Sequence, residues 1–70
     1  MRVKELIGKE VLDANVKKIG KVSDLEVDIA KGLVEYIEVK ASLTKGYHVG
    51  LDKIHVVGEK IILKVKEEEL

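Results

Sequence analysis

The amino-acid sequence predicts a small all-β domain, and three observations lead to this prediction. Apolar residues make up 46% of the 70 positions, and most are aliphatic types whose β-branched members favour strands. Turn residues separate the apolar runs at intervals of about 8 to 12 residues, which is typical of a barrel or sandwich. Only Arg2 to Ile7 reads as helix, and Gly8 limits it to a turn or two.

The first half of the chain is expected to form two strands joined by a turn. Residues 10–12 read as a short strand, residues 13–15 as a turn and residues 18–28 as a long strand. Within the long strand the apolar positions change phase at Ser23-Asp24, which predicts a bulge that absorbs the slip. Gly20 is expected to mark a bend of the kind that a small barrel needs.

The second half is expected to form a third strand, a fourth strand and a closing hairpin. A turn at 30–32 leads into a strand at 33–40, and a loop at 41–46 connects it to a strand at 47–51. A tight turn at 52–54 then precedes a hairpin made of residues 55–57 and 60–66. The sequence therefore predicts a small β-barrel of about six short, strongly bent antiparallel strands.

Two of these strands carry apolar residues in both phases. The third strand does so along most of its length, and Ile61-Ile62-Leu63 does so in the closing hairpin. A chain this short has one core, so the second apolar face must meet either a terminal segment or another chain. A homodimer is predicted on this ground. The interface residues chosen from these strands and from the two tyrosines are Val34, Tyr36, Tyr47 and Ile62.

Composition restricts the class of protein. There is no Cys, which excludes a disulfide scaffold and a thiolate metal site. The 13 basic and 13 acidic residues cancel, so general attraction to polyanions is not expected. Richness in Lys and Glu with few amide residues suggests a thermophilic source. No apolar run spans a membrane or forms an export signal, so a cytoplasmic location is expected.

The domain is expected to occupy residues 1–66, followed by an acidic tail at 67–70. Three consecutive glutamates, Glu67-Glu68-Glu69, dominate this last segment. A run of like charges at a chain end is usually solvated and mobile, which is the expectation for this one.

No catalytic, cofactor or metal site is predicted, and the chain is expected not to be an enzyme. Asp24, Glu26 and Asp28 alternate on one strand face, but residues two apart lie about 6.6 to 7 Å from each other, too far to share one cation. They are expected to face Lys on a neighbouring strand. His48 and His55 are expected at the surface or at strand ends, because no nucleophile motif or third metal ligand accompanies them.

A basic stretch offers an alternative to protein binding. Lys17, Lys18 and Lys21 lie close together in the sequence and are the candidate phosphate contacts for an RNA-binding role. No aromatic residue adjoins them for base stacking, and acidic residues follow directly. The six glycines never form a phosphate-binding loop pattern.

Several of these segments together resemble the PRC-barrel family. Residues 8–13 and the run Ile19-Gly20-Lys21-Val22-Ser23-Asp24-Leu25-Glu26-Val27-Asp28 are similar to its signature, and residues 34–39, 49–54 and 57–63 are similar to its later strands. The family includes the cytoplasmic barrel of the photosynthetic reaction centre H subunit and the C-terminal domain of a ribosome maturation factor. The chain looks most like its short stand-alone archaeal members.

The resemblance implies a non-enzymatic adaptor that binds a protein partner, in cell division or in the assembly of a larger complex. The ribosome maturation relatives imply the alternative, an RNA-metabolism or ribosome-assembly protein. Two positions depart from the family pattern. Val16 stands where Gly is usual after Asn15, and Gly50 stands where Pro is common, so the path of the chain at both places is open.

Overall fold

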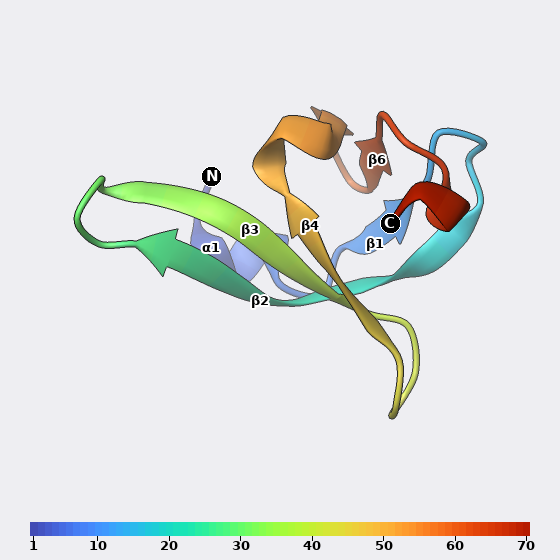
Figure 1. The fold of residues 1–70 in the computed structure, drawn as a ribbon, viewed down its shortest axis with the longest axis horizontal. Coiled ribbons are helices and arrows are strands. Elements are labelled where there is room, and N and C mark those ends of the chain that lie inside the picture. The colour runs from blue at the N-terminus through green and yellow to red at the C-terminus, as the bar shows by residue number, and fades with distance from the viewer.

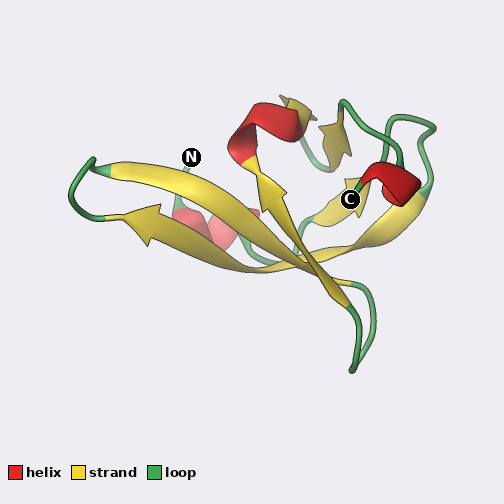
Figure 2. Cartoon of the chain, in the orientation of Figure 1, coloured by secondary structure: helices red, strands yellow, loops and turns green.

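A computed structural model describes residues 1–70 as one curled β-sheet with three short helical turns (Figure 1). The elements in chain order are α1 (Val3–Leu6), β1 (Glu10–Leu12), β2 (Lys18–Asp28), β3 (Leu33–Lys40), β4 (Gly46–Gly50), η1 (Leu51–Lys53), β5 (Ile54–Val57), β6 (Ile61–Leu63) and η2 (Glu67–Glu69). The predicted all-β class is confirmed, and Figure 2 shows how little of the chain is helical.

The first three strands lie at their predicted positions, and later boundaries differ slightly. β4 begins and ends one residue earlier than expected. β6 contains three residues instead of the expected run 60–66. The reason is that the chain after Leu63 bonds elsewhere: the N–H of Lys64 donates to the carbonyl of Lys53, and the carbonyl of Val65 accepts from Ala14.

All six strands form one sheet in the order β4-β3-β2-β1-β6-β5. The sheet is not closed, because β4 and β5 are its two edges and are linked by η1 without pairing. The predicted closed barrel is therefore not seen. The prediction of a wholly antiparallel sheet was also wrong, since β1 and β6 are parallel. Tight turns impose antiparallel pairing only on strands that they join, and β1 and β6 stand far apart in the chain.

The long strand β2 is bent where its sequence changes phase. The pairing of β2 with β3 shifts register between Val22 and Asp24, which confirms the predicted bulge at Ser23. Gly20 is buried against β3, and a Cβ added there would lie 2.5 Å from the carbonyl oxygen of Lys40. A glycine at position 20 therefore lets two strands approach closely at the bend.

The core is thin, and nine hydrophobic residues are buried in it. One continuous cluster collects side chains from five strands: Val11, Ile19, Val22, Ile37, Val39, Val49, Ile61 and Leu63. Curling of the sheet brings β6 over β3 and β4, so the inner faces of these strands cover one another (Figure 1). The distal end of the β2–β3 hairpin extends beyond this cluster.

Candidate functional site

The distal β2–β3 hairpin, residues 26–36, exposes apolar side chains to solvent. It projects away from the other strands at the left of Figure 1. Ile29 is 85% exposed at its turn, and Leu33 and Val27 are 56% and 47% exposed. Val27 pairs with Val34 and continues the row of Leu25 beyond the core. Ile29 is the most exposed of these three side chains.

Carboxylates flank the apolar residues on the same hairpin. The acidic set on β2 and β3 comprises Asp24, Glu26, Asp28, Glu35 and Glu38. Asp24 pairs with Glu38 across the strands, Glu26 with Tyr36 and Asp28 with Leu33. The expectation that lysines on the neighbouring strand face these acids was wrong, because the register sets other residues opposite them. No group of three or more acidic or histidine side chains is placed to hold a metal ion.

Two of these acids interact directly at the hairpin. A hydrogen bond with Asp28 raises the pKa of the Glu35 carboxyl, so Glu35 holds its proton to higher pH than an isolated glutamate. The backbone N–H of Lys31, followed by the same contact with Glu35, lowers the pKa of Asp28. The hairpin therefore combines an exposed apolar turn with several carboxylates, of which Asp28 also lies 3.9 Å from the ammonium group of Lys31.

Tyr36 and His48 form a stacked pair on the outer face of β3 and β4. Their ring centroids lie 4.6 Å apart with planes inclined by 20°. His48 Nε2 lies 3.1 Å from a carboxylate oxygen of Glu26 on β2. This cross-strand cluster joins β2, β3 and β4 and fixes the orientation of the tyrosine ring.

A second surface is a basic groove between the start of β2 and the β3–β4 loop. It has a volume of about 420 Å³ and is lined by Lys18, Lys21 and Lys40, by the apolar side chains of Val22 and Leu43 and by small residues, with no acidic side chain. Lys21 and Lys40 pair directly across β2 and β3, and neither forms an ion pair. Lys18 contacts Glu10 at 3.5 Å.

Lys17, the third predicted phosphate contact, points away from this groove. Its ammonium group lies 2.7 Å from Glu67, and this contact raises the pKa of Lys17. The structure thus separates Lys17 from Lys18 and Lys21. Lys40 takes its place beside them. Sequence reasoning missed Lys40 because it lies 19 positions after Lys21, and only strand register brings the two together.

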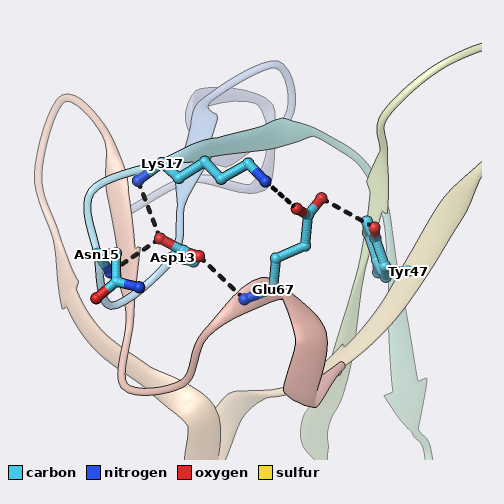
Figure 3. A network of polar contacts seen from close by, with 5 residues as sticks. All are labelled: Asp13, Asn15, Lys17, Tyr47 and Glu67. Atoms are coloured by element: carbon cyan, nitrogen blue, oxygen red, sulfur yellow. Dashed lines mark hydrogen bonds and ion pairs between the residues drawn. The ribbon is translucent and has the colours of Figure 1, made fainter.

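A polar clasp, made of Asp13, Asn15, Lys17, Tyr47 and Glu67, holds the C-terminal segment (Figure 3). Asp13 is 1% exposed. Its Oδ1 accepts from the backbone N–H groups of Asn15 and Lys17 at 2.9 Å, and its Oδ2 accepts from that of Glu67 at 3.0 Å. Tyr47 donates its hydroxyl to Glu67 at 3.0 Å.

The clasp corrects the expectation of a free acidic tail. Glu67 and Leu70 are half-buried, whereas Glu68 and Glu69 are exposed. Bonds to Lys17 and then Tyr47 lower the pKa of Glu67, and the N–H of Lys17 lowers that of Asp13. Sequence reasoning passed over Asp13, although an aspartate directly before a turn commonly accepts such backbone bonds.

The four predicted interface residues do not form one surface. Val34 is half-buried and Tyr36 is 38% exposed, and both lie on the projecting hairpin. Tyr47 is half-buried in the clasp, packed against the core and covered by the Lys45 ammonium 5.4 Å from its ring centroid. Ile62 lies on β6 between Leu12 and Val56. Val34 and Tyr36 lie on one hairpin, where they stand opposite Val27 and Glu26.

Comparison with known proteins places these features in a family. The model of the PRC-barrel domain matches the chain over residues 1–70. The chain belongs to the PRC-barrel domain family. No curated protein matches it. Among solved structures, it is similar to RimM of Pseudomonas aeruginosa, a 16S ribosomal RNA processing protein, with a TM-score of 0.75 and 14% identity. The match covers 100% of this chain and 46% of RimM, and at this identity it shows the shared fold.

The structure shows the backbone conformation at the two positions, Val16 and Gly50, where this PRC-barrel chain departs from the family pattern. Val16 adopts a φ of 62°, the left-handed conformation that glycine favours. Bonds from Asp13 to the turn keep this conformation despite the β-branched side chain. Gly50 has a φ of −65°, the value that proline imposes, but a Cβ added there would lie 2.6 Å from Oδ1 of Asp52.

No helix of this PRC-barrel chain has the length and apolar character needed to cross a lipid bilayer.

Proposed function

We propose that this PRC-barrel chain is a non-catalytic adaptor that docks onto a protein through its distal β2–β3 hairpin during assembly of a larger complex. The observation that carries the proposal is the exposure of Ile29, Leu33 and Val27 on an element that projects beyond the core. A soluble chain that leaves several neighbouring large apolar side chains uncovered gains most from a partner that covers them.

The side chains of the hairpin indicate which types of residue a partner surface would present. The exposed apolar side chains lie on the same hairpin as the carboxylates of Glu26, Asp28 and Glu35. A protein segment that presents aliphatic residues among lysines or arginines matches both features, because interfaces combine an apolar centre with a charged rim of complementary sign. The stacked ring of Tyr36 adds an aromatic contact of the kind enriched at interfaces.

Family membership supports an adaptor role, and two biological settings follow from it. The resemblance to stand-alone archaeal members implies cell division. The fold likeness to RimM, a 16S ribosomal RNA processing protein, supports a setting in ribosome assembly. The chain spans under half of RimM, so the activity of that whole protein is carried over only as part of this proposal.

A homodimer is the second element of the proposal. Leu12, Ile62 and Val56 pair in one row across β1, β6 and β5. Leu12 is 8% exposed, Ile62 half-buried and Val56 46% exposed, so the row opens toward the unpaired edge of β5. A second copy of the chain would cover this row and edge.

A pull-down with matched variants tests the docking surface. Tagged wild-type protein, an Ile29→Ser/Leu33→Ser variant and a Leu43→Ser control are incubated with source lysate, with and without ribonuclease. Leu43 is 92% exposed at the β3–β4 tip, so it controls for loss of an exposed leucine. We expect a discrete protein that survives ribonuclease, stays with the control and is lost from the hairpin variant.

A second candidate function, an RNA-associated role in ribosome assembly, is favoured by the unpaired lysines of the basic groove. In the same experiment it predicts bound material that ribonuclease removes and that the hairpin variant retains. Retention of an identical set of proteins by wild type and hairpin variant after ribonuclease contradicts docking through the hairpin.

A further inference from the structure

The pairing of Lys21 with Lys40 has no counter-charge within the chain. The two residues lie directly opposite on β2 and β3, and like charges in this position destabilise a sheet. Neither forms an ion pair, although 13 acidic residues are available in the sequence. Two adjacent uncompensated ammonium groups are the arrangement that an anionic ligand neutralises.

The carboxylate next to this pair is already engaged. Glu10 on β1 stands opposite Lys21 in the register, yet its oxygens contact Lys18 at 3.5 Å and Lys60 at 3.4 Å. Burial acts to raise the pKa of Glu10, but the two lysines outweigh it and the pKa is lowered. The charge of Glu10 is thus shared by two lysines, which leaves the groove positive.

The walls of the groove are built for a ligand that lies along it. Close approach of β2 at Gly20 brings the strand against the backbone of Lys40. Ser42 accepts the N–H of Lys45 at 3.1 Å through Oγ, so its hydroxyl proton is available to an acceptor. Beyond Lys40 the surface continues into a hollow of about 470 Å³, which adds Lys45 together with Glu38 and His48.

The ligand of this groove must carry negative charge that neutralises the lysines, and its bases are not recognised. No aromatic side chain lines the groove, and the ring of Tyr47 in the adjoining hollow is covered by Lys45. Stacking, the main source of base contact with single strands, is therefore absent. Three lysines that line one open groove match the phosphates of a nucleic acid, which are its sequence-independent part.

We infer that the groove of Lys18, Lys21 and Lys40 binds the phosphodiester backbone of a single nucleic-acid strand without sequence preference. This inference goes beyond docking through the β2–β3 hairpin and concerns another surface. It gives the RNA-associated alternative a site, and its failure leaves the hairpin proposal unaffected.

The test is fluorescence anisotropy with a labelled oligouridylate of about 12 nucleotides, a probe that stacks weakly. The full chain is compared with Lys21→Gln/Lys40→Gln and with the control Lys64→Gln/Lys66→Gln. Lys64 and Lys66 are exposed and their side chains make no ion pair or hydrogen bond, so the control removes equal charge elsewhere. Thermal melting establishes that each variant is folded.

Binding by wild type that falls at least tenfold in the groove variant and less than twofold in the control supports the site. We expect the logarithm of the association constant to fall with log salt with a slope of about −2 for wild type, because each of three phosphate contacts contributes about −0.7. The groove variant keeps one of the three lysines, so its slope should be about −0.7. No binding by wild type, or equal loss in both variants, overturns it. Full competition by millimolar inorganic phosphate, or stronger binding to vesicles of anionic phospholipid, overturns the assignment to a strand.

Discussion

The backbone N–H of Glu67 donates a hydrogen bond of 3.0 Å to the buried carboxylate of Asp13. This contact joins residues 54 positions apart and ties the end of the chain to the turn after β1. The same carboxylate accepts two bonds from within its own turn. One side chain therefore fixes both the entry into β2 and the position of the last segment.

Replacement of Asp13 by alanine should destabilise the domain strongly. Three backbone donors would lose a charged acceptor, and a buried donor without a partner is costly. We expect a fall in Tm of roughly 10 °C for a domain of this size. Asp52→Ala is the matched control, since Asp52 is exposed and makes no hydrogen bond, and it should change Tm little. An unchanged Tm for Asp13→Ala would show that the clasp does not contribute to stability.

Stability should decrease in acid through the clasp. Hydrogen bonds lower the folded-state pKa values of Asp13 and Glu67, so these carboxyls bind protons more readily when the chain is unfolded. Their contribution is complete above their ordinary values of about 4 and is lost as pH falls below them. Urea unfolding of wild type and Asp13→Asn from pH 7 to 3 should show curves that converge at the acidic end. Curves that stay parallel over this range contradict the linkage.

Replacement of Val16 by glycine should stabilise the domain. Val16 is 65% exposed and has a φ of 62°, a conformation that costs an L-residue with a β-branched side chain about 1 kcal/mol or more. Relief of this strain should exceed the extra flexibility of glycine in the unfolded chain. Val56→Gly, in the extended strand β5, should be destabilising in the same urea experiment. A loss of stability in Val16→Gly would show that the turn does not require the left-handed conformation.

The proposed dimer should be visible by light scattering at tens of micromolar protein. We expect a mass of twice the 7.8 kDa of one chain. Val56→Lys places a charge on the exposed end of the apolar row and should yield a folded monomer. Ile29→Ser, on the projecting hairpin, should remain dimeric. A monomeric mass for wild type refutes the dimer directly.

Docking through the acidic hairpin should depend on salt. Complementary charges around an apolar centre accelerate association and are screened as ionic strength rises. Once the partner is identified, Glu26→Gln/Glu35→Gln should slow association severalfold with a smaller effect on dissociation, measured by surface plasmon resonance. Glu68→Gln/Glu69→Gln, which removes the same charge from exposed positions of η2, is the control. Equal effects of both variants would argue against the hairpin as the charged contact.

Much of the strand arrangement was predictable because its signals are local. The bounds of β1, β2 and β3 follow from apolar runs and turn residues. The bulge at Ser23 follows from the change of the apolar positions from even to odd numbers within β2. The sheet is not closed, so the predicted barrel is not confirmed, and the prediction of antiparallel strands throughout was wrong at the β1–β6 pair. Closure and the direction of β6 beside β1 depend on contacts between distant segments, for which the strand patterns carry no signal.

The candidate surfaces divide in the same way. Tyr36 and Val34 were chosen from a strand with two apolar faces, and the structure locates both on the projecting hairpin. The most exposed residue of that hairpin, Ile29, lies in a turn where alternation of side chains gives no guide. The carboxylates of β2 were expected to face lysines on the neighbouring strand, and only the β2–β3 register shows that other residues stand opposite them.

The sequence by itself determined the all-β class, the positions of the first strands and the bend in β2, because backbone propensity and side-chain alternation act over a few residues. Tertiary structure decided which charges are free. It pairs Lys17 with Glu67 and leaves Lys21 opposite Lys40, although Lys17 and Lys21 lie four positions apart in the chain. The physical reason is that a lysine's partner depends on the register of strands and on the path of the terminus, which are set by packing of the whole core.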